Sequence, residues 1–316
     1  MDNLKIDIER GKQVAKILFD KFNSDEGIFG KNIMPEDLLW GSDLSETGVK
    51  KKSYEHLMFI TMVVSIDYQR DADKLWQAGR NTIDDAETKW LFSPKIVKDK
   101  PIDEIMTAMK KHRLSQKYGK DAEIWKRVSG SFVRHYDSDP RNLIKECEYD
   151  AMKLFNKKYD IRFKKDFPFL SGNKIFPLWI RMLHDNLGIK LKNLEKMPIP
   201  VDVHIARATF TTGCLKGEYR GSISDMSPKI DEAWKKIIEK VDHPKLKYAL
   251  QMDESLWHLS KNGCVSRKGG NFCPKRRQCP VGELCIGGHV HVSAKGIKVS
   301  TGEIHEKTSL DNFMFK

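Results

Sequence analysis

The stretch NGCVSRKGGNFCPKRRQCPVGELCIGG, residues 262–288, holds four of the six cysteines of this chain. They follow one another as C-x8-C-x5-C-x5-C, from Cys264 through Cys273 and Cys279 to Cys285. The N-terminus carries alternating charges and no apolar leader, so we expect the chain to stay in the reducing cytoplasm, where disulfides are rare. Four thiols this close together therefore predict a metal centre, either a [4Fe–4S] cluster or a four-cysteine zinc site.

The uneven spacing of these cysteines favours the [4Fe–4S] cluster. Zinc sites are usually built from C-x2-C or C-x4-C pairs, and neither pair occurs in this stretch. Zinc stays open as an alternative, because His289 and His291 follow closely and are possible further ligands. Cys147 and Cys214 lie apart from the other four, so we do not expect them to bind the metal.

The charge of the chain points to a polyanionic partner. The 316 residues carry a formal net charge of +12, with a pI near 9.2. Cationic side chains release counterions when they neutralise phosphates, which favours binding to nucleic acid. The longest apolar run, residues 57–66, is far too short to cross a bilayer, so no membrane contact is expected.

Hydrophobic periodicity predicts an all-α fold. Apolar positions recur at helical spacing along most of the chain, and strand-like alternation is scarce outside the tail. The tail, residues 289–304, alternates well enough for a small hairpin. Helices are expected over 3–22, 53–78, 101–117, 121–135, 140–157, 175–187, from 203, from 227 and over 244–262.

Lys174 is a candidate nucleophile. It follows the tight turn Ser171-Gly172-Asn173 and precedes an apolar helical run, in the stretch FPFLSGNKIFPLW at 167–179. An ammonium group in apolar surroundings is destabilised, which makes such a lysine a usable amine nucleophile. The alternatives are a lysine that reaches solvent or one that contacts a phosphate beside the turn.

Asp202 is a candidate catalytic carboxylate. It follows Pro198-Ile199-Pro200 and stands where the helix from Val203 should be capped. A carboxylate fixed there is able to stabilise a cation or to deprotonate a nucleophile. The alternative is that Asp202 only caps its helix.

In this order, the elements resemble the helix-hairpin-helix DNA glycosylase superfamily, whose endonuclease III branch carries a [4Fe–4S] cluster. The resemblance rests on LSGNK at 170–174, VDVHIAR at 201–207, LWHLSKNGC at 256–264 and the closing CPVGELC at 279–285. It covers roughly residues 52–290.

The resemblance implies a two-lobed helical fold with a C-terminal cluster loop. Residues 52–192 would form a helical barrel with the hairpin, and residues 1–51 with 193–316 the second lobe. The protein would be a monomer that binds double-stranded DNA. It would extrude a damaged or modified base and excise it as a bifunctional glycosylase and AP lyase.

The resemblance also implies the roles of individual residues. Lys174 would attack the sugar, and Asp202 would activate Lys174 and stabilise the cationic sugar. Cys264, Cys273, Cys279 and Cys285 would hold the cluster. DNA would be contacted by Tyr68, Gln69 and Arg70 at a helix end, by Gly172 in the hairpin, and by Arg276 and Arg277 in the cysteine loop.

The chain departs from the family pattern at two places. The hairpin usually reads Leu-Pro-Gly-x-Gly-x-Lys, whereas this chain has only Gly172. The long gap from Lys174 to Asp202 and the unusual hairpin resemble the archaeal 8-oxoguanine glycosylase branch, which lacks the cluster. The first two cysteine gaps, x8 and x5, are also longer than usual. Two alternatives therefore stay open: a monofunctional glycosylase in which Asp202 activates water, and a non-catalytic nucleic-acid-binding protein with zinc.

Overall fold

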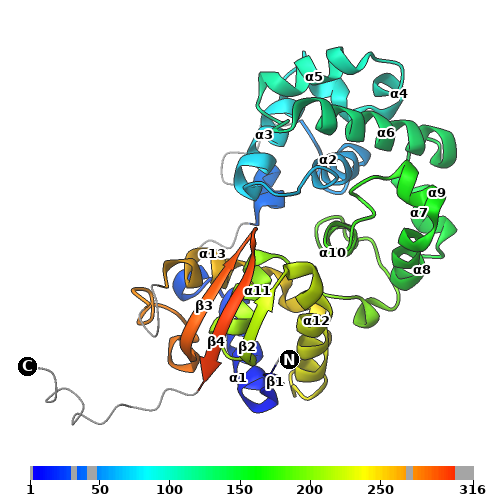
Figure 1. The fold of residues 1–316 in the computed structure, drawn as a ribbon. Helices are drawn as coiled ribbons and strands as arrows, with labels where there is room; N and C mark the ends of the chain where they lie inside the picture. The colour runs from blue at the N-terminus through cyan, green and yellow to red at the C-terminus, as the bar shows by residue number, and fades with distance from the viewer. Residues whose placement is uncertain (1–2, 30–33, 41–47, 268–272, 303–316) are drawn as a thin grey trace, which may run out of the picture. The chain divides into compact units, whose positions relative to one another are not determined.

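The computed structural model describes residues 3–29, 34–40, 48–267 and 273–302 (Figure 1). The chain forms two compact units, Ile33–Pro200 and Met1–Asn32 with Val201–Lys316. The boundaries expected from sequence, at residues 52 and 192, stay a prediction. The unit Ile33–Pro200 is called the hairpin unit below, and the other is called the sheet unit.

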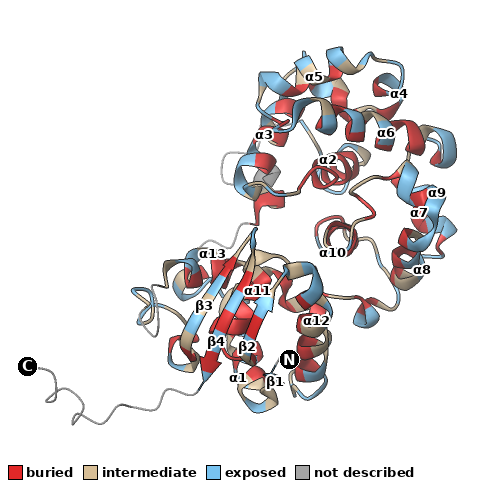
Figure 2. Ribbon diagram, viewed as in Figure 1, coloured by how far each residue is buried: buried red, intermediate tan, exposed pale blue. Residues whose placement is uncertain are grey.

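The hairpin unit is helical in its described residues and is built around two buried helices, α2 and α10. Figure 2 shows both almost wholly in the colour of buried residues. Trp179 of α10 donates its indole N–H to the Thr61 hydroxyl of α2 at 3.1 Å, and both are buried. The α-helices are α2 (Tyr54–Val64), α3 (Ala72–Asp84), α4 (Pro94–Val97), α5 (Ile102–Lys111), α6 (Tyr118–Tyr136), α7 (Pro140–Glu146), α8 (Ala151–Asn156), α9 (Ile161–Asp166) and α10 (Ile175–Asp185), and the short 3-10 turns are Pro35–Trp40, Lys89–Phe92, Lys157–Tyr159 and Leu194–Lys196.

The single helix predicted over 53–78 is wrong, because the chain turns between α2 and α3. Gln69 lies in the turn with a φ of +52°, a left-handed conformation that a continuous helix does not allow. Asp71 then restarts the helix, since its carboxylate accepts a hydrogen bond from the Lys74 amide at 3.1 Å. Local side-chain chemistry therefore overrides an otherwise good helical pattern.

The sheet unit corrects the all-α prediction, since it holds a four-stranded antiparallel sheet in the order β1-β2-β4-β3. Its helices α11 and α13 pack together, and Trp234 of α12 donates to Thr209 of α11 at 2.9 Å. The strands are β1 (Asn3–Ile6), β2 (Leu215–Gly221), β3 (Gly287–Ser293) and β4 (Gly296–Gly302). The helices are α1 (Ile8–Asn23), α11 (Val203–Thr211), α12 (Ile223–Glu239) and α13 (Asp253–Asn262), and the 3-10 turns are Gly27–Phe29, Ala249–Met252, Cys264–Ser266 and Gly282–Leu284.

The predicted tail hairpin is confirmed as the pair β3–β4, with Val290 opposite Val299; residues 303–304 lie outside the described residues. The other two strands were missed. β1 is too short to separate from the helix that follows it, and β2 has only Leu215 and Tyr219 as buried apolar residues. Both strands depend on partners far away in sequence, and such pairing leaves little local signal.

Two predicted helix starts in the sheet unit are also wrong. The helix expected from Ser227-Pro228 begins earlier, at Ile223, because Ser222 caps it by accepting from the Asp225 amide at 3.0 Å. The helix expected from His243-Pro244 is delayed to Asp253. The His243 ring accepts from the amides of Lys245 and Leu246 and so forms a turn instead. No helix among the described residues is long and apolar enough to cross a membrane.

Candidate functional site

The predicted hairpin joins α9 to α10 through residues 167–174. The Gly172 amide donates to the Phe169 carbonyl at 2.8 Å, and the Gly172 carbonyl accepts from the Phe176 amide at 2.9 Å. A Cβ at position 172 would stand 2.9 Å from the Phe169 oxygen, so the turn needs glycine there. Phe169 itself has a φ of +63°, a costly conformation for a bulky side chain. The predicted tight turn before α10 is confirmed. The geometry of this turn is a sufficient reason for glycine at position 172.

Lys174 lies at the N-cap position of α10, without a side-chain cap, and faces a carboxylate. Its Nζ lies 3.9 Å from Oδ2 of Asp67, whose side chain is 7% exposed while that of Lys174 is 34% exposed. A carboxylate at this distance is placed to accept a proton from the Lys174 ammonium group. Sequence reasoning missed Asp67. The available signal was an acidic residue directly after the apolar run 57–66.

Tyr68, next to Asp67, stacks on Phe169 of the hairpin. The ring centroids are 4.3 Å apart and the planes 17° from parallel. The Tyr68 hydroxyl donates to Oδ1 of Asp121 at 2.7 Å, and burial together with this bond raises the pKa of Tyr68. Lys117 lies 4.2 Å from the Tyr68 ring centroid and Lys120 4.8 Å from that of Phe169. The hairpin and the turn before α3 thus meet in a fixed aromatic stack with cations over it.

Gln69 and Arg70 are the other two predicted DNA contacts at this turn, and they differ in how accessible their side chains are to a ligand. Gln69 is exposed and accepts a hydrogen bond from Lys117 Nζ at 2.9 Å. Arg70 is half-buried and donates to the Leu114 carbonyl at 2.9 Å, and burial lowers its pKa. Gln69 stands open to a partner, whereas Arg70 holds the turn to the segment before α6.

Asp202 caps α11, as the sequence predicts. Its Oδ1 accepts from the amides of His204 at 2.7 Å and Ile205 at 3.0 Å. Capping alone does not mark it, because five other aspartates in the described part of the chain cap helices with a side-chain acceptor in the same way. They are Asp7, Asp71, Asp139, Asp150 and Asp160.

Arg207, from the same segment as Asp202, connects α11 to α13 and to β3. Its guanidinium donates to the Ser260 hydroxyl at 3.0 Å and to the Val292 carbonyl at 2.7 Å. Burial lowers the pKa of Arg207, while the charges of Cys264 and Asp202 act in the opposite direction. Asp202, Arg207 and Cys264 are therefore electrostatic neighbours in the sheet unit.

The four cysteines of the loop influence one another. Burial raises the pKa of Cys264 well above its usual value, and the charges of Cys285, Cys279 and Cys273 raise it further. Burial also raises the pKa of Cys279 to about 12, and Cys285 and Cys273 add to this effect. A thiol in such a place ionises only against a neighbouring cation, and a metal supplies one.

The loop around these thiols is held by arginines and by one close backbone contact. Arg10 donates to the Leu284 carbonyl at 2.7 Å, and Arg267 donates to the carbonyls of Ile286 and Gly288. A Cβ at Gly282 would stand 2.1 Å from the Arg276 carbonyl oxygen, so the closing C-x5-C segment needs this glycine.

These cysteines fit a thiolate-bound metal centre in their chemistry. They are free thiols, gathered from one loop. Burial raises the pKa of Cys285, and Arg267, Arg276 and Arg10 offset part of this rise. Among the described residues, no three or more His, Cys, Asp or Glu side chains are already arranged to hold a metal ion. The metal and its identity therefore stay predictions.

The two predicted arginines of the loop differ in exposure. Arg276 forms an ion pair with Glu283 at 3.1 Å and is partly covered. Arg277 is exposed. Of the two, Arg277 is the side chain that a phosphate reaches without breaking an ion pair.

The candidate residues thus form two groups. Lys174, Asp67, Tyr68 and Phe169 meet in the hairpin unit. Asp202, Arg207 and the cysteines meet in the sheet unit.

The chain was compared with known families, curated proteins and solved structures. No protein-family model matches this chain, and no curated protein matches it. The chain is similar to the solved "Structure of a non-covalent Endonuclease III-DNA Complex", with 12% sequence identity and a TM-score of 0.47, over 86% of this chain and 96% of that one.

Proposed function

We propose that this protein is a DNA glycosylase with AP-lyase activity, which excises a damaged or modified base from double-stranded DNA. The observation that carries the proposal is the pair Lys174–Asp67 at the end of the hairpin. It places a partly exposed amine beside a buried carboxylate at the position where the resemblance puts the catalytic lysine. The enzyme is proposed to act as a monomer.

In the proposed reaction, Lys174 loses a proton and its Nζ forms a bond to C1′ of the target nucleotide. The bond between C1′ and the base breaks, and the base leaves with the bonding electrons and gains a proton. Asp67 is the carboxylate within reach of the Lys174 proton. Asp202 is proposed to face the sugar as positive charge develops there and to assist in activating Lys174.

The lyase step follows from the same covalent bond. The sugar ring opens to give a protonated Schiff base between Nζ and C1′. Loss of a proton from C2′ then expels the 3′ phosphate by β-elimination, which breaks the C3′–O bond and nicks the strand. Water finally hydrolyses the Schiff base and frees Lys174.

The Tyr68–Phe169 stack supports a role beside the extruded nucleotide. Enzymes that act on a base take it out of the helix, and the gap is filled by a protein side chain. Gln69 is exposed at the tip of this turn, and Lys117 and Lys120 over the rings are suited to the flanking phosphates. We propose that Gln69 enters the DNA, and that Tyr68 and Arg70 hold its turn in place.

Cys264, Cys273, Cys279 and Cys285 are proposed to hold one [4Fe–4S] cluster. The cluster would fix the loop that presents Arg276 and Arg277 to phosphate, and it takes no part in the reaction. Iron and acid-labile sulfide should be found in anaerobically purified protein, with broad visible absorbance. A protein with stoichiometric zinc and neither iron nor sulfide would support the zinc alternative instead.

Borohydride trapping tests the proposal, because it reduces a Schiff base to a stable cross-link. The protein is mixed with duplexes that each carry one oxidised, deaminated or mismatched base, and adducts are resolved on a denaturing gel. At least one duplex should yield an adduct and a nicked strand. Base release without any adduct would support a monofunctional enzyme, and no release from any duplex would overturn the proposal.

A further inference from the structure

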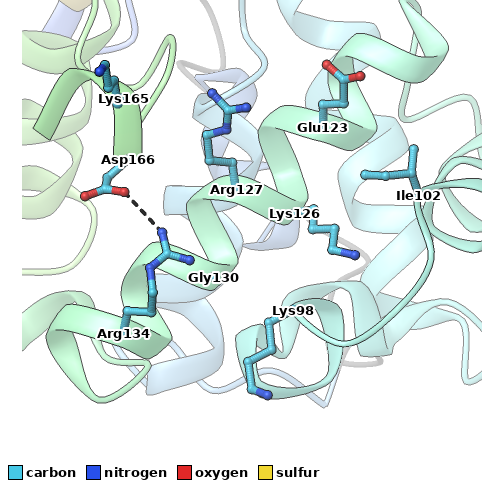
Figure 3. A pocket seen from close by; sticks show the side chains of 9 residues that line it. All are labelled: Lys98, Ile102, Glu123, Lys126, Arg127, Gly130, Arg134, Lys165 and Asp166. Carbon is cyan, nitrogen blue, oxygen red and sulfur yellow. Dashed lines mark hydrogen bonds and ion pairs between the residues drawn. The ribbon is translucent and has the colours of Figure 1, made fainter. Parts of the chain in front are cut away.

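A basic groove runs along α6 in the hairpin unit. Its volume is about 620 Å³. Figure 3 shows α6 crossing the groove, with Lys165 and Asp166 of α9 on one side and Lys98 and Ile102 on the other. The lining residues are Lys98, Ile102, Glu123, Lys126, Arg127, Gly130, Arg134, Lys165 and Asp166. They include none of Tyr68, Gln69, Gly172 or Lys174.

The lining carries a clear excess of positive charge. Five of its side chains are cationic and two are carboxylates. One of the carboxylates, Asp166, is engaged by Arg134 at 3.1 Å and by His135 at 3.2 Å. Arg127 and Lys165 are exposed. The groove therefore attracts an anion.

One cation of the groove is held in place. Arg134 donates to the Ser131 hydroxyl at 2.9 Å and to Asp166 at 3.1 Å. A Cβ at Gly130 would lie 3.1 Å from the other terminal nitrogen of Arg134, so the absent side chain gives the guanidinium room. A guanidinium fixed in this way loses little freedom when it binds a phosphate.

The shape and composition of the groove fit a phosphodiester backbone. The lining has no aromatic ring on which a base would stack and only one branched aliphatic side chain, Ile102. Arg127 and Arg134 stand seven residues apart on α6, which at about 1.5 Å per residue is about 10 Å along its axis. Three steps of one DNA strand rise about 10 Å as well.

We propose that this groove binds the sugar-phosphate backbone of duplex DNA, through residues that belong neither to the hairpin nor to the cysteine loop. The inference rests on the proposed function only for the choice of DNA as the polyanion. Binding there is independent of sequence and of damage, since phosphates carry no base information. The groove would hold the enzyme on undamaged DNA.

Fluorescence anisotropy with an undamaged, labelled duplex tests this proposal across a range of salt concentrations. The variant combines Arg127→Gln with Lys165→Gln, two exposed positions at which folding should survive. Loss of two phosphate contacts should lower the slope of log affinity against log salt by about 1.8. The matched control combines Lys145→Gln with Lys190→Gln, which removes the same charge from exposed positions outside the lining.

The proposal stands if the slope of log affinity against log salt is lower in the groove variant and unchanged in the control. Equal slopes in both variants would overturn it, because net charge alone would then account for binding. A calorimetric titration with inorganic tripolyphosphate completes the test. If the groove variant loses tripolyphosphate binding but keeps the wild-type duplex slope, the groove takes a small anion and the proposal is wrong. Base release is measured separately, so the binding result can be interpreted even if the proposed excision is not observed.

Discussion

Two helix starts carry the proposed chemistry, and they are built in opposite ways. α11 begins at Asp202, whose carboxylate accepts two backbone amides. α10 begins at Lys174, which makes no side-chain cap and places a cation at the positive end of a helix. An acidic cap stabilises its helix, whereas a lysine there is unfavourable. Helix capping alone is a sufficient reason for an aspartate at position 202, but it is no reason for a lysine at position 174.

This difference shows where substitutions are easiest to interpret. A change at Asp202 disturbs both a cap and a proposed catalytic group, so the choice of the new residue decides what is measured. A change at Lys174 removes no side-chain cap, because Lys174 makes none. The Asp67 carboxylate opposite it offsets the unfavourable position, which makes the pair the clearest sign of function in this chain.

Lys174→Gln should give the largest effect, a complete loss of borohydride-trapped adduct. Glutamine fills the same space but has no amine to bond C1′. The measurement is a denaturing gel after trapping on the duplex that wild type processes best. Lys158→Gln is a control, since Lys158 contacts Asn173 of the same hairpin at 3.2 Å. An adduct that persists in Lys174→Gln and vanishes in Lys158→Gln would move the nucleophile to Lys158.

Asp202→Asn should lower single-turnover base release by at least about a hundredfold while DNA binding stays close to wild type. Asparagine still caps the helix, so the loss would report the missing negative charge. Base release is followed with enzyme in excess, and binding by anisotropy on the same duplex. Near-wild-type base release would mean that Asp202 only caps its helix.

Asp67→Asn should slow trapping about tenfold at neutral pH, because the proposed proton acceptor beside Lys174 is lost. The deficit should shrink as pH rises, since hydroxide and buffer bases then take the proton instead. The ratio of wild-type to variant trapping rates between pH 6 and about 9 is the measurement. A ratio that stays constant with pH would mean that Asp67 only positions the lysine.

Local chemistry decided which parts of the site were predictable from sequence. The Asp202 cap and the turn before α10 depend on residues within a few positions of one another, and both were predicted correctly. The tail hairpin was also predictable, because its strands alternate and adjoin. The cysteine group is local too, although its metal stays a prediction.

Contacts between distant segments account for what sequence reasoning missed. Asp67 matters only because the turn before α3 packs against a hairpin that comes much later in the chain. β1 joins the sheet only through β2, whose residues lie beyond the whole hairpin unit in sequence. The groove along α6 collects residues from α4 to α9, each an ordinary surface charge in its own segment. Neither Asp67, nor β1, nor the groove has a pattern in its local sequence from which it could be predicted.

The next smaller effect separates the two roles of Asp202. Asp202→Ala should cost about 1 kcal/mol of unfolding free energy relative to Asp202→Asn, because alanine cannot cap. Asp160→Ala is the matched control, since Asp160 caps α9 through the amides of Arg162 and Phe163. Urea denaturation should show a similar loss in both alanine variants, but only Asp202→Ala should lose base release. Equal loss of activity in both would mean that stability alone limits the reaction.

The smallest expected effect concerns the stability of the Lys174–Asp67 pair. Lys174 is about one-third exposed, so its ion pair is screened, and a double-mutant cycle of Lys174→Gln with Asp67→Asn should give a coupling energy below about 1 kcal/mol. Unfolding free energies of the four proteins from urea titrations supply the cycle. The same four proteins in the trapping assay should show strong coupling, because Asp67 has no proton to accept once the amine is gone. A coupling of several kcal/mol in stability would identify the pair as a structural ion pair and remove the reason for assigning it to catalysis.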